Sequence, residues 1–353
     1  MSEVGPAMDS LDIDLLVKVF KHTAFSPFFI FMIPAFYFFQ GNPIDHAVIV
    51  YSTVYGILLC GFWSLRWLSV LWRNQGSLFL APERFAWGEQ VVVITGGSSG
   101  IGELLANTLA VRNVTVVVLD KKPIVTENHH IMFHKCDVSK WEEVEAVAKT
   151  IVEQVGHPTV LINNAGVVQG KLILDLSPQE IKETFDVNTL AHFWTLKAFL
   201  PEMIKNNCGH IVTVSSIFGV GACSQLTDYC ASKAAITSLH DSLRYELDKR
   251  HNAPKVRTTL VMPGHTSTQM FDSVKEPSAL VKFLAPQLAP VVVVKAIIAA
   301  LDNQYSTTLY LPFFANFMPM VRILPSYLRD LFQWLSGADY LMMGFDKRRS
   351  GKA

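Results

Sequence analysis

The segment VVVITGGSSGIG, residues 91–102, joins a run of β-branched residues to a glycine-rich turn. Its first five residues are typical of a buried strand, and Ile101 to Ala110 continues as a helix. Glycines let the backbone approach an anionic group, and the N-terminus of a helix attracts that group. This order therefore predicts a pyrophosphate site for a dinucleotide. The residues expected to form it are Gly96, Ser98, Ser99, Gly100, Ile101 and Gly102.

A second apolar strand, Val114 to Leu119, ends at Asp120. A carboxylate at this position accepts hydrogen bonds from the adenosine ribose and repels a 2′-phosphate, which favours NAD over NADP. Lys121 and Lys122 follow directly, and either ammonium could swing toward a phosphate. NAD is therefore the preferred cofactor, and NADP is the alternative.

From about Glu89, apolar runs alternate with amphipathic stretches, as in repeated βαβ units. The pattern predicts an α/β fold with a Rossmann-type doubly wound parallel sheet, preceded by an N-terminal hydrophobic helical hairpin. We expect an anchoring segment over residues 1–80, a catalytic domain over 81–312 and a hydrophobic or amphipathic extension over 313–353.

Three residues downstream have the chemistry for alcohol oxidation or carbonyl reduction. Tyr229 and Lys233 are four residues apart and share one face of a helix, so the ammonium can favour the phenolate. Tyr229 is the expected proton acceptor or donor. Ser216 follows the apolar strand Ile211 to Val214 and can bind the substrate oxygen.

With these motifs in this order, residues from Glu89 to Pro312 resemble the short-chain dehydrogenase/reductase family. The resemblance implies that Asn188 is a fourth catalytic residue, which holds a water linked to Lys233. It also selects Ser216 over Ser215. The further cofactor-binding residues that it implies are Asp137, Val138, Asn163, Ala165, Gly166, Tyr229, Lys233, Pro263, Gly264, Thr266 and Thr268.

The N-terminal part contains two uncharged apolar stretches. No Asp, Glu, Lys or Arg occurs from Thr23 to Ile44 or from Ala47 to Leu65, and each stretch is about long enough to cross a bilayer. Pro34 could kink the first stretch. A cleaved signal peptide and a hairpin buried in a soluble core are the alternatives.

Basic residues before and after this hairpin place both outer flanks, and the catalytic domain, in the cytosol. These residues are Lys18, Lys21, Arg66 and Arg73. The hairpin, Asp120 and the apolar C-terminal extension resemble the membrane-associated retinol and 17-beta-hydroxysteroid dehydrogenase branch. That resemblance implies a lipophilic substrate and a location on the endoplasmic reticulum membrane or a lipid droplet.

Apolar residues after Gly264 are expected either to cover the substrate or to pack on the core. They are Met270, Phe271, Leu280, Val281, Phe283 and Leu284. Beyond Pro312, a helical pattern opened or kinked by Pro325 is expected to lie on the membrane, on the domain or against a second subunit of a homodimer. A basic tail from Lys347 to Lys352 follows.

The overall composition argues against two other classes. Thirty acidic and thirty basic residues cancel, so the charge gives no reason to expect a nucleic-acid partner. Five scattered cysteines are expected to be reduced, and the cluster His129, His130 and His134 lacks further ligands, so no metal site is predicted.

The leading hypothesis is a membrane-associated NAD(P)-dependent oxidoreductase that interconverts alcohol and carbonyl groups on a retinoid, steroid or long-chain lipid. One alternative is an NADP-dependent reductase of 3-ketoacyl or ketosphingoid lipids. Another is a non-catalytic scaffold on a lipid droplet or the endoplasmic reticulum, against which the intact catalytic set argues.

Overall fold

One parallel sheet of seven strands, in the order β3-β2-β1-β4-β5-β6-β7, organises the computed structural model. The structure describes residues 12–74, 85–125, 128–271, 274 and 278–345. The strands are β1 (Val91–Thr95), β2 (Thr115–Asp120), β3 (Ile131–Lys135), β4 (Val160–Asn163), β5 (Gly209–Val214), β6 (Val256–Pro263) and β7 (Thr307–Leu311). The strand order reverses between β1 and β4, which confirms the predicted doubly wound sheet.

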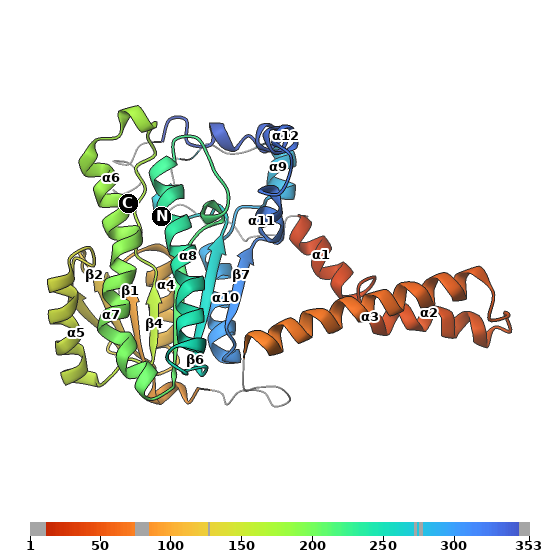
Figure 1. Cartoon of the computed structure of the whole chain (residues 1–353), viewed down its shortest axis with the longest axis horizontal. Coiled ribbons are helices and arrows are strands. Elements are labelled where there is room, and N and C mark those ends of the chain that lie inside the picture. Colours follow the sequence, from red (N-terminus) through yellow and green to blue (C-terminus); the bar gives the residue numbers. More distant parts are fainter. Residues whose placement is uncertain (1–11, 75–84, 126–127, 272–273, 275–277, 346–353) are drawn as a thin grey trace.

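Helices cover both faces of the sheet because alternate strand residues point to opposite sides (Figure 1). Val92 and Ile94 lie in the same buried cluster as residues of α4 (Gly100–Ala110) and α10 (Pro290–Asn303). The opposite face is covered by α5 (Trp141–Val155), α7 (Ala191–Lys205) and α8 (Thr227–Lys249). Both faces of the strands are therefore buried, as their continuous apolar runs require.

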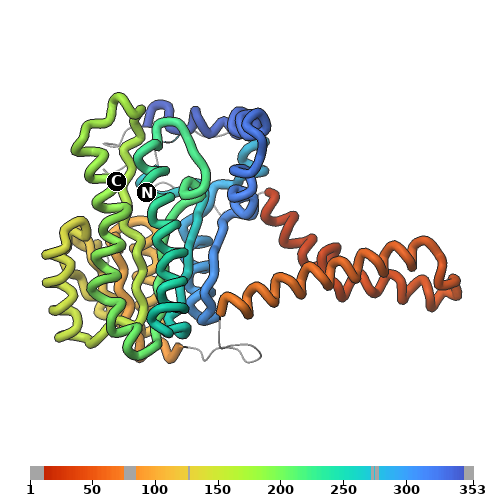
Figure 2. Tube along the Cα trace, in the orientation of Figure 1, coloured from red at the N-terminus to blue at the C-terminus, as the bar shows by residue number. Residues whose placement is uncertain are grey.

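An N-terminal helical arm projects from the β7 side of the sheet (Figures 1 and 2). It consists of α1 (Ile13–His22), α2 (Pro27–Phe39) and α3 (Ala47–Arg73). Helices α2 and α3 pack side by side, and a Cβ atom at Gly56 would lie only 2.8 Å from the Phe31 ring. This glycine therefore permits the close approach of the two helices.

The arm differs in detail from the two continuous spans expected. Among the described helices, α3 alone is long and apolar enough to cross a bilayer unbroken, whereas α1 and α2 meet that criterion only together, with a 52° bend between them. Residues 23–26 separate α1 from α2, so the expected stretch from Thr23 to Ile44 contains only the 13-residue helix α2, which continues through Pro34.

Both ends of the arm are attached to the sheet domain. At the end of α3, the buried Asn74 side chain accepts a hydrogen bond from the Ser306 amide at 2.6 Å and donates one to the Ser306 carbonyl at 3.3 Å. At the start of α1, the Asp14 carboxylate accepts a hydrogen bond from the Phe313 amide at 2.9 Å. These residues flank β7, so the arm is held at both ends of this edge strand.

Short helices follow the last two strands. They are η5 (Gln269–Phe271), α9 (Ala279–Leu284), η6 (Phe313–Phe317), α11 (Met318–Val321), α12 (Ser326–Ser336) and η7 (Ala338–Tyr340). Pro325 precedes α12, as its sequence position predicts, and no residue of α12 is buried. Leu280 and Leu284 of α9 are also exposed, whereas Met270 and Phe271 are packed. The basic tail expected from Lys347 lies outside the described residues.

Candidate active site

The glycine-rich turn between β1 and α4 is too tightly packed to accept side chains at two positions. Gly96 has φ +66°, a conformation that L side chains rarely adopt, and a Cβ atom there would lie 2.8 Å from the Ala165 backbone. A Cβ atom at Gly102 would lie 2.2 Å from the Gly96 carbonyl oxygen. The Asn164 amide donates to the Gly96 and Thr95 carbonyl oxygens at 3.0 and 3.2 Å. Asn164, which lies in the Asn163–Gly166 segment of the resemblance, thus holds the turn in place.

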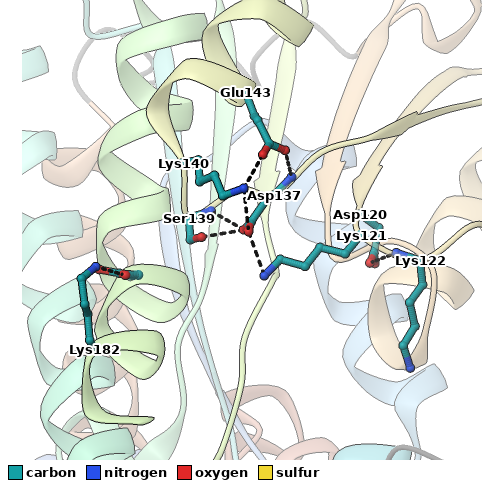
Figure 3. A network of polar contacts seen from close by, with 9 residues as sticks. Asp120, Lys121, Lys122, Asp137, Ser139, Lys140, Glu143 and Lys182 are labelled. Atoms are coloured by element: carbon teal, nitrogen blue, oxygen red, sulfur yellow. Dashed lines mark hydrogen bonds and ion pairs between the residues drawn. The ribbon is translucent and has the colours of Figure 1, made fainter. Parts of the chain in front are cut away.

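The polar network at the ends of β2 and β3 surrounds the expected adenosine position (Figure 3). One Asp120 carboxylate oxygen accepts from the Ser98 amide at 3.1 Å, and the other accepts from the Lys122 amide at 3.1 Å. Asp120 therefore connects the strand end to the glycine-rich turn. The Lys121 ammonium instead forms an ion pair with Asp137 at 3.0 Å.

Asp137 is held in its charged form. Partial burial opposes this by raising the pKa of Asp137, but hydrogen bonds from Ser139 and Lys121 prevail and hold the pKa below its usual value. The Ser139 hydroxyl donates to the carboxylate at 2.6 Å, and Val138 beside it is buried. The position therefore presents a fixed carboxylate beside an apolar side chain.

The remaining predicted cofactor residues converge on the same carboxyl edge of the sheet. A Cβ atom at Gly166 would lie 3.5 Å from Asn188 Oδ1 and 3.6 Å from Lys233 Nζ, and one at Gly100 would lie 3.7 Å from the Thr268 side chain. Gly264 follows β6 and donates its amide to the Leu311 carbonyl. The other members at this edge are Ser99, Ile101, Asn163, Ala165, Pro263 and Thr266.

This edge fits a dinucleotide. Its glycine-rich turn carries no side chain at Gly96, Gly100 and Gly102, α4 begins there, and Asp120 ends the neighbouring strand. In addition, the Asn163 side-chain amide nitrogen is buried without a hydrogen-bond partner among the described residues. These features would hold the diphosphate and the ribose of NAD or NADP.

Ser216, Tyr229 and Lys233 come together from β5 and α8. Tyr229 and Lys233 are only 5% and 3% exposed, and the Ser216 hydroxyl, which contacts the Pro263 carbonyl at 3.5 Å, is close enough to the phenol to lower its pKa. The Lys233 ammonium donates to the Val214 carbonyl at 3.0 Å. Ser215 points elsewhere, because its hydroxyl donates to the Lys233 carbonyl and contacts Thr237. The second serine of the pair is therefore the one beside the tyrosine.

Asn188 lies in a π-helical segment, Asp186–Leu190, between α6 (Pro178–Phe185) and α7. Its side chain accepts from the Val167 amide at 2.7 Å and donates to the Val167 carbonyl at 3.0 Å. It also donates to the Ser232 hydroxyl at 3.0 Å. Such π-helical segments are frequent at functional sites, and this one fixes Asn188 beside Gly166.

Burial dominates the protonation of the central pair. It raises the pKa of Tyr229 above its ordinary value, although the hydrogen bond with Ser216 opposes this shift. Burial also lowers the pKa of Lys233 to about 8. The sequence predicts that the Lys233 ammonium and a bound nicotinamide together favour the phenolate; burial of Tyr229 opposes this, and the ammonium is directed at the Val214 carbonyl.

Apolar side chains surround the phenol on its substrate side. Phe271 packs edge-on against the Tyr229 ring, with centroids 6.4 Å apart. The buried members of this cluster besides Tyr229 are Val168, Cys223, Leu226 and Met342, and its partly buried members include Phe218, Met270 and Phe271. Sequence patterns did not identify Met342, because it is far along the chain and outside any helix.

Within the described ranges, no group of three His, Cys, Asp or Glu side chains is arranged to hold a metal ion. All five cysteines are free.

Comparison with known proteins identifies relatives of the chain. A family model described as short chain dehydrogenase matches residues 90–279. The chain is 36% identical to epidermal retinol dehydrogenase 2 of Mus musculus over 292 residues, which cover 79% of the chain and 92% of that protein. It is 42% identical to dehydrogenase RED2 of Cochliobolus heterostrophus over 216 residues, or 60% and 80% of the two chains. A short-chain dehydrogenase from Streptomyces avermitilis, 23% identical, shares the fold with a TM-score of 0.58 over 70% of this chain and 97% of its own.

Proposed function

The chain belongs to the short-chain dehydrogenase family, and we propose that it is a membrane-associated, NAD-preferring dehydrogenase or reductase of a lipophilic alcohol or carbonyl compound. Membership makes it an NAD(P)-dependent oxidoreductase. We propose in addition its cofactor preference, its substrate class, the roles of its site residues and its location.

In this mechanism, Ser216 binds the substrate oxygen and Tyr229 exchanges a proton with it. During oxidation the phenolate takes the hydroxyl proton, and during reduction the phenol donates it. When bound at this edge, NAD or NADP would supply the hydride-transfer chemistry. Lys233 stabilises the phenolate by its charge. Asn188, which like Lys233 lies beside Gly166, positions the proton path.

A preference for NAD is supported by Lys121, whose ammonium is already engaged in an ion pair beside the expected ribose position. Lys121 is engaged by Asp137 at 3.0 Å, so it is directed away from a 2′-phosphate. Asp120 adds a negative charge at the strand end, where that phosphate would lie. Lys122 donates its backbone amide to the same carboxylate and so lies close to it.

A lipophilic substrate is supported above all by the apolar cluster around Tyr229. Tyr229 packs in a cluster with Val168, Leu226 and Phe271, so the surroundings of the phenol, where the substrate must bind, are largely hydrocarbon. Relatives named as retinol dehydrogenases agree with a long apolar alcohol. Retinoids, steroids and long-chain lipids all have this chemistry.

Membrane association is supported by the helical arm and by α12. Large apolar side chains of α12 are exposed, among them Tyr327, Leu331, Trp334 and Leu335. The preceding η6 contacts α1, so this surface lies next to the arm (Figure 1). We assign both to the cytosolic face of the endoplasmic reticulum or a lipid droplet, with residues 1–80 as the anchor, 81–312 as the catalytic domain and 313–353 as the extension.

The test is turnover by membranes that contain the full chain, with retinol, steroid and long-chain alcohols and with NAD compared with NADP. Faster oxidation of these alcohols than of short polar alcohols, with NAD, supports the proposal. Reduction of 3-ketoacyl or ketosphingoid lipids with NADPH would favour the alternative enzyme. No turnover in either direction, with cofactor bound, would favour a scaffold.

A further inference from the structure

The C-terminal segment 333–345, called the strap below, lies across the loop that follows β5. The Asp339 carboxylate accepts from the Ser224 amide at 3.0 Å, and the Cys223 thiol donates to the Ala338 carbonyl at 3.0 Å. Gln333 completes the attachment, because its side-chain amide donates to the Ala222 carbonyl at 3.1 Å and to Asp339 at 3.0 Å. Several specific hydrogen bonds therefore hold the strap at one place.

The strap also inserts apolar side chains beneath this attachment. Met342 is 2% exposed and belongs to the cluster that contains Tyr229, whereas its neighbour Met343 is 58% exposed. The Phe345 ring lies so close to Gly170 that a Cβ atom there would be 2.2 Å from the ring. The strap thus packs against the loop after β4 as well as the loop after β5.

We propose that the strap is the outer wall of the substrate pocket and that Met342 sets the length of the apolar chain accepted beside Tyr229. This inference rests on the proposed function. The cluster has Phe271 at the phenol and the buried Met342 of the strap, so a hydrocarbon chain that leaves the reacting carbon on this side of Tyr229 would meet the strap. An unbranched thioether fills such a space adaptably, and its truncation would lengthen the pocket.

The first test compares Met342→Ala with the matched control Met343→Ala on primary alcohols of increasing chain length. We expect Met342→Ala to raise the ratio of kcat/KM for long over short alcohols by about tenfold or more, as a few methylene groups can. Met343→Ala should keep the wild-type ratio. Equal ratios in wild type and both variants would overturn the assignment.

Two measurements separate a failure of the strap from a failure of the proposed function. If no alcohol is oxidised, calorimetric titration with non-oxidisable long-chain amides still tests the pocket. Met342→Ala should bind the longer amides relatively more tightly, and an unchanged length preference overturns the proposal.

Alkylation of Cys223, followed by mass spectrometry, tests the attachment directly. We expect Cys223 to be alkylated about tenfold faster in Asp339→Ala than in Asp330→Ala, a control variant at an exposed position of α12. Equal labelling rates would also contradict the proposal.

Discussion

The Lys233 ammonium lies 5.7 Å from the centre of the Tyr229 ring and donates its hydrogen bond to the Val214 carbonyl instead of the phenol. Val214 ends β5, the strand that leads to Ser216. The position of the ammonium is therefore set by the sheet, and its charge acts on the tyrosine through space. This arrangement supports a phenol that is neutral before the cofactor binds and becomes more acidic when a positive nicotinamide arrives.

Replacing Gly102 with alanine should weaken cofactor binding. The new Cβ atom would lie 2.2 Å from the Gly96 carbonyl oxygen, so the turn that receives the diphosphate must shift. Gly88→Ala is the control, because a Cβ atom there meets nothing within 4 Å. Titration with NADH, followed by its fluorescence, should show at least about tenfold weaker binding for Gly102→Ala alone. Equal affinities would show that the turn does not hold the cofactor.

Asp120→Ala should shift the cofactor preference toward NADP. Loss of the carboxylate removes its repulsion of a 2′-phosphate, and the ratio of kcat/KM for NADP over NAD should rise about tenfold or more. The exposed Asp175→Ala serves as the control for a change in charge. An unchanged ratio would mean that Asp120 acts only through its bonds to the Ser98 and Lys122 amides.

Acid should destabilise the fold below about pH 6.5 through three buried histidines. Burial lowers the pKa of His192, His210 and His240 to about 3 each, from an ordinary 6.5. Between pH 6.5 and 3 the unfolded chain binds protons that the folded chain excludes, so the free energy of unfolding falls as the pH falls. His240→Asn should reduce proton uptake on unfolding by up to one proton, measured from denaturant midpoints against pH. If the free energy of unfolding changes with pH by the same slope in His240→Asn, in wild type and in the exposed control His251→Asn, this account is refuted.

Asn74→Ala should loosen the attachment of the helical arm. It removes both hydrogen bonds to Ser306 and leaves a buried amide unpaired, at a cost of about 1–3 kcal/mol. Hydrogen exchange of the full chain in membranes should therefore increase at Ser306 and in β7. The exposed Asn316→Ala should leave this exchange unchanged. Equal protection in both variants would show that Asn74 does not fix the arm.

The sheet could be predicted because its strands are short apolar runs between glycines and polar ends. Val91 to Thr95 matches β1, and the expected strand from Val114 is displaced by one residue, to Thr115–Asp120. The first apolar stretch was less predictable. Hydropathy alone does not show that α1 ends at His22 and that α2 starts only at Pro27.

The candidate catalytic residues and the glycine-rich turn could be selected from the sequence because their spacing reflects one strand end or one helix face. Residues that act through long-range packing could not. Met342 reaches the Tyr229 cluster from more than a hundred residues downstream. The direction of the Tyr229 pKa also required the structure, since it depends on burial and on where the Lys233 ammonium points.

The most direct test of the account is turnover by membranes carrying Tyr229→Phe, compared with wild type and with Tyr245→Phe. Tyr245 is exposed on the same helix, so its variant controls for the loss of a phenol hydroxyl. We expect Tyr229→Phe to lose about 10²- to 10⁴-fold in kcat with a long-chain alcohol, because the proton acceptor is gone. Turnover by Tyr229→Phe at the rate of wild type and Tyr245→Phe would contradict the assignment of Tyr229 as the catalytic acid and base.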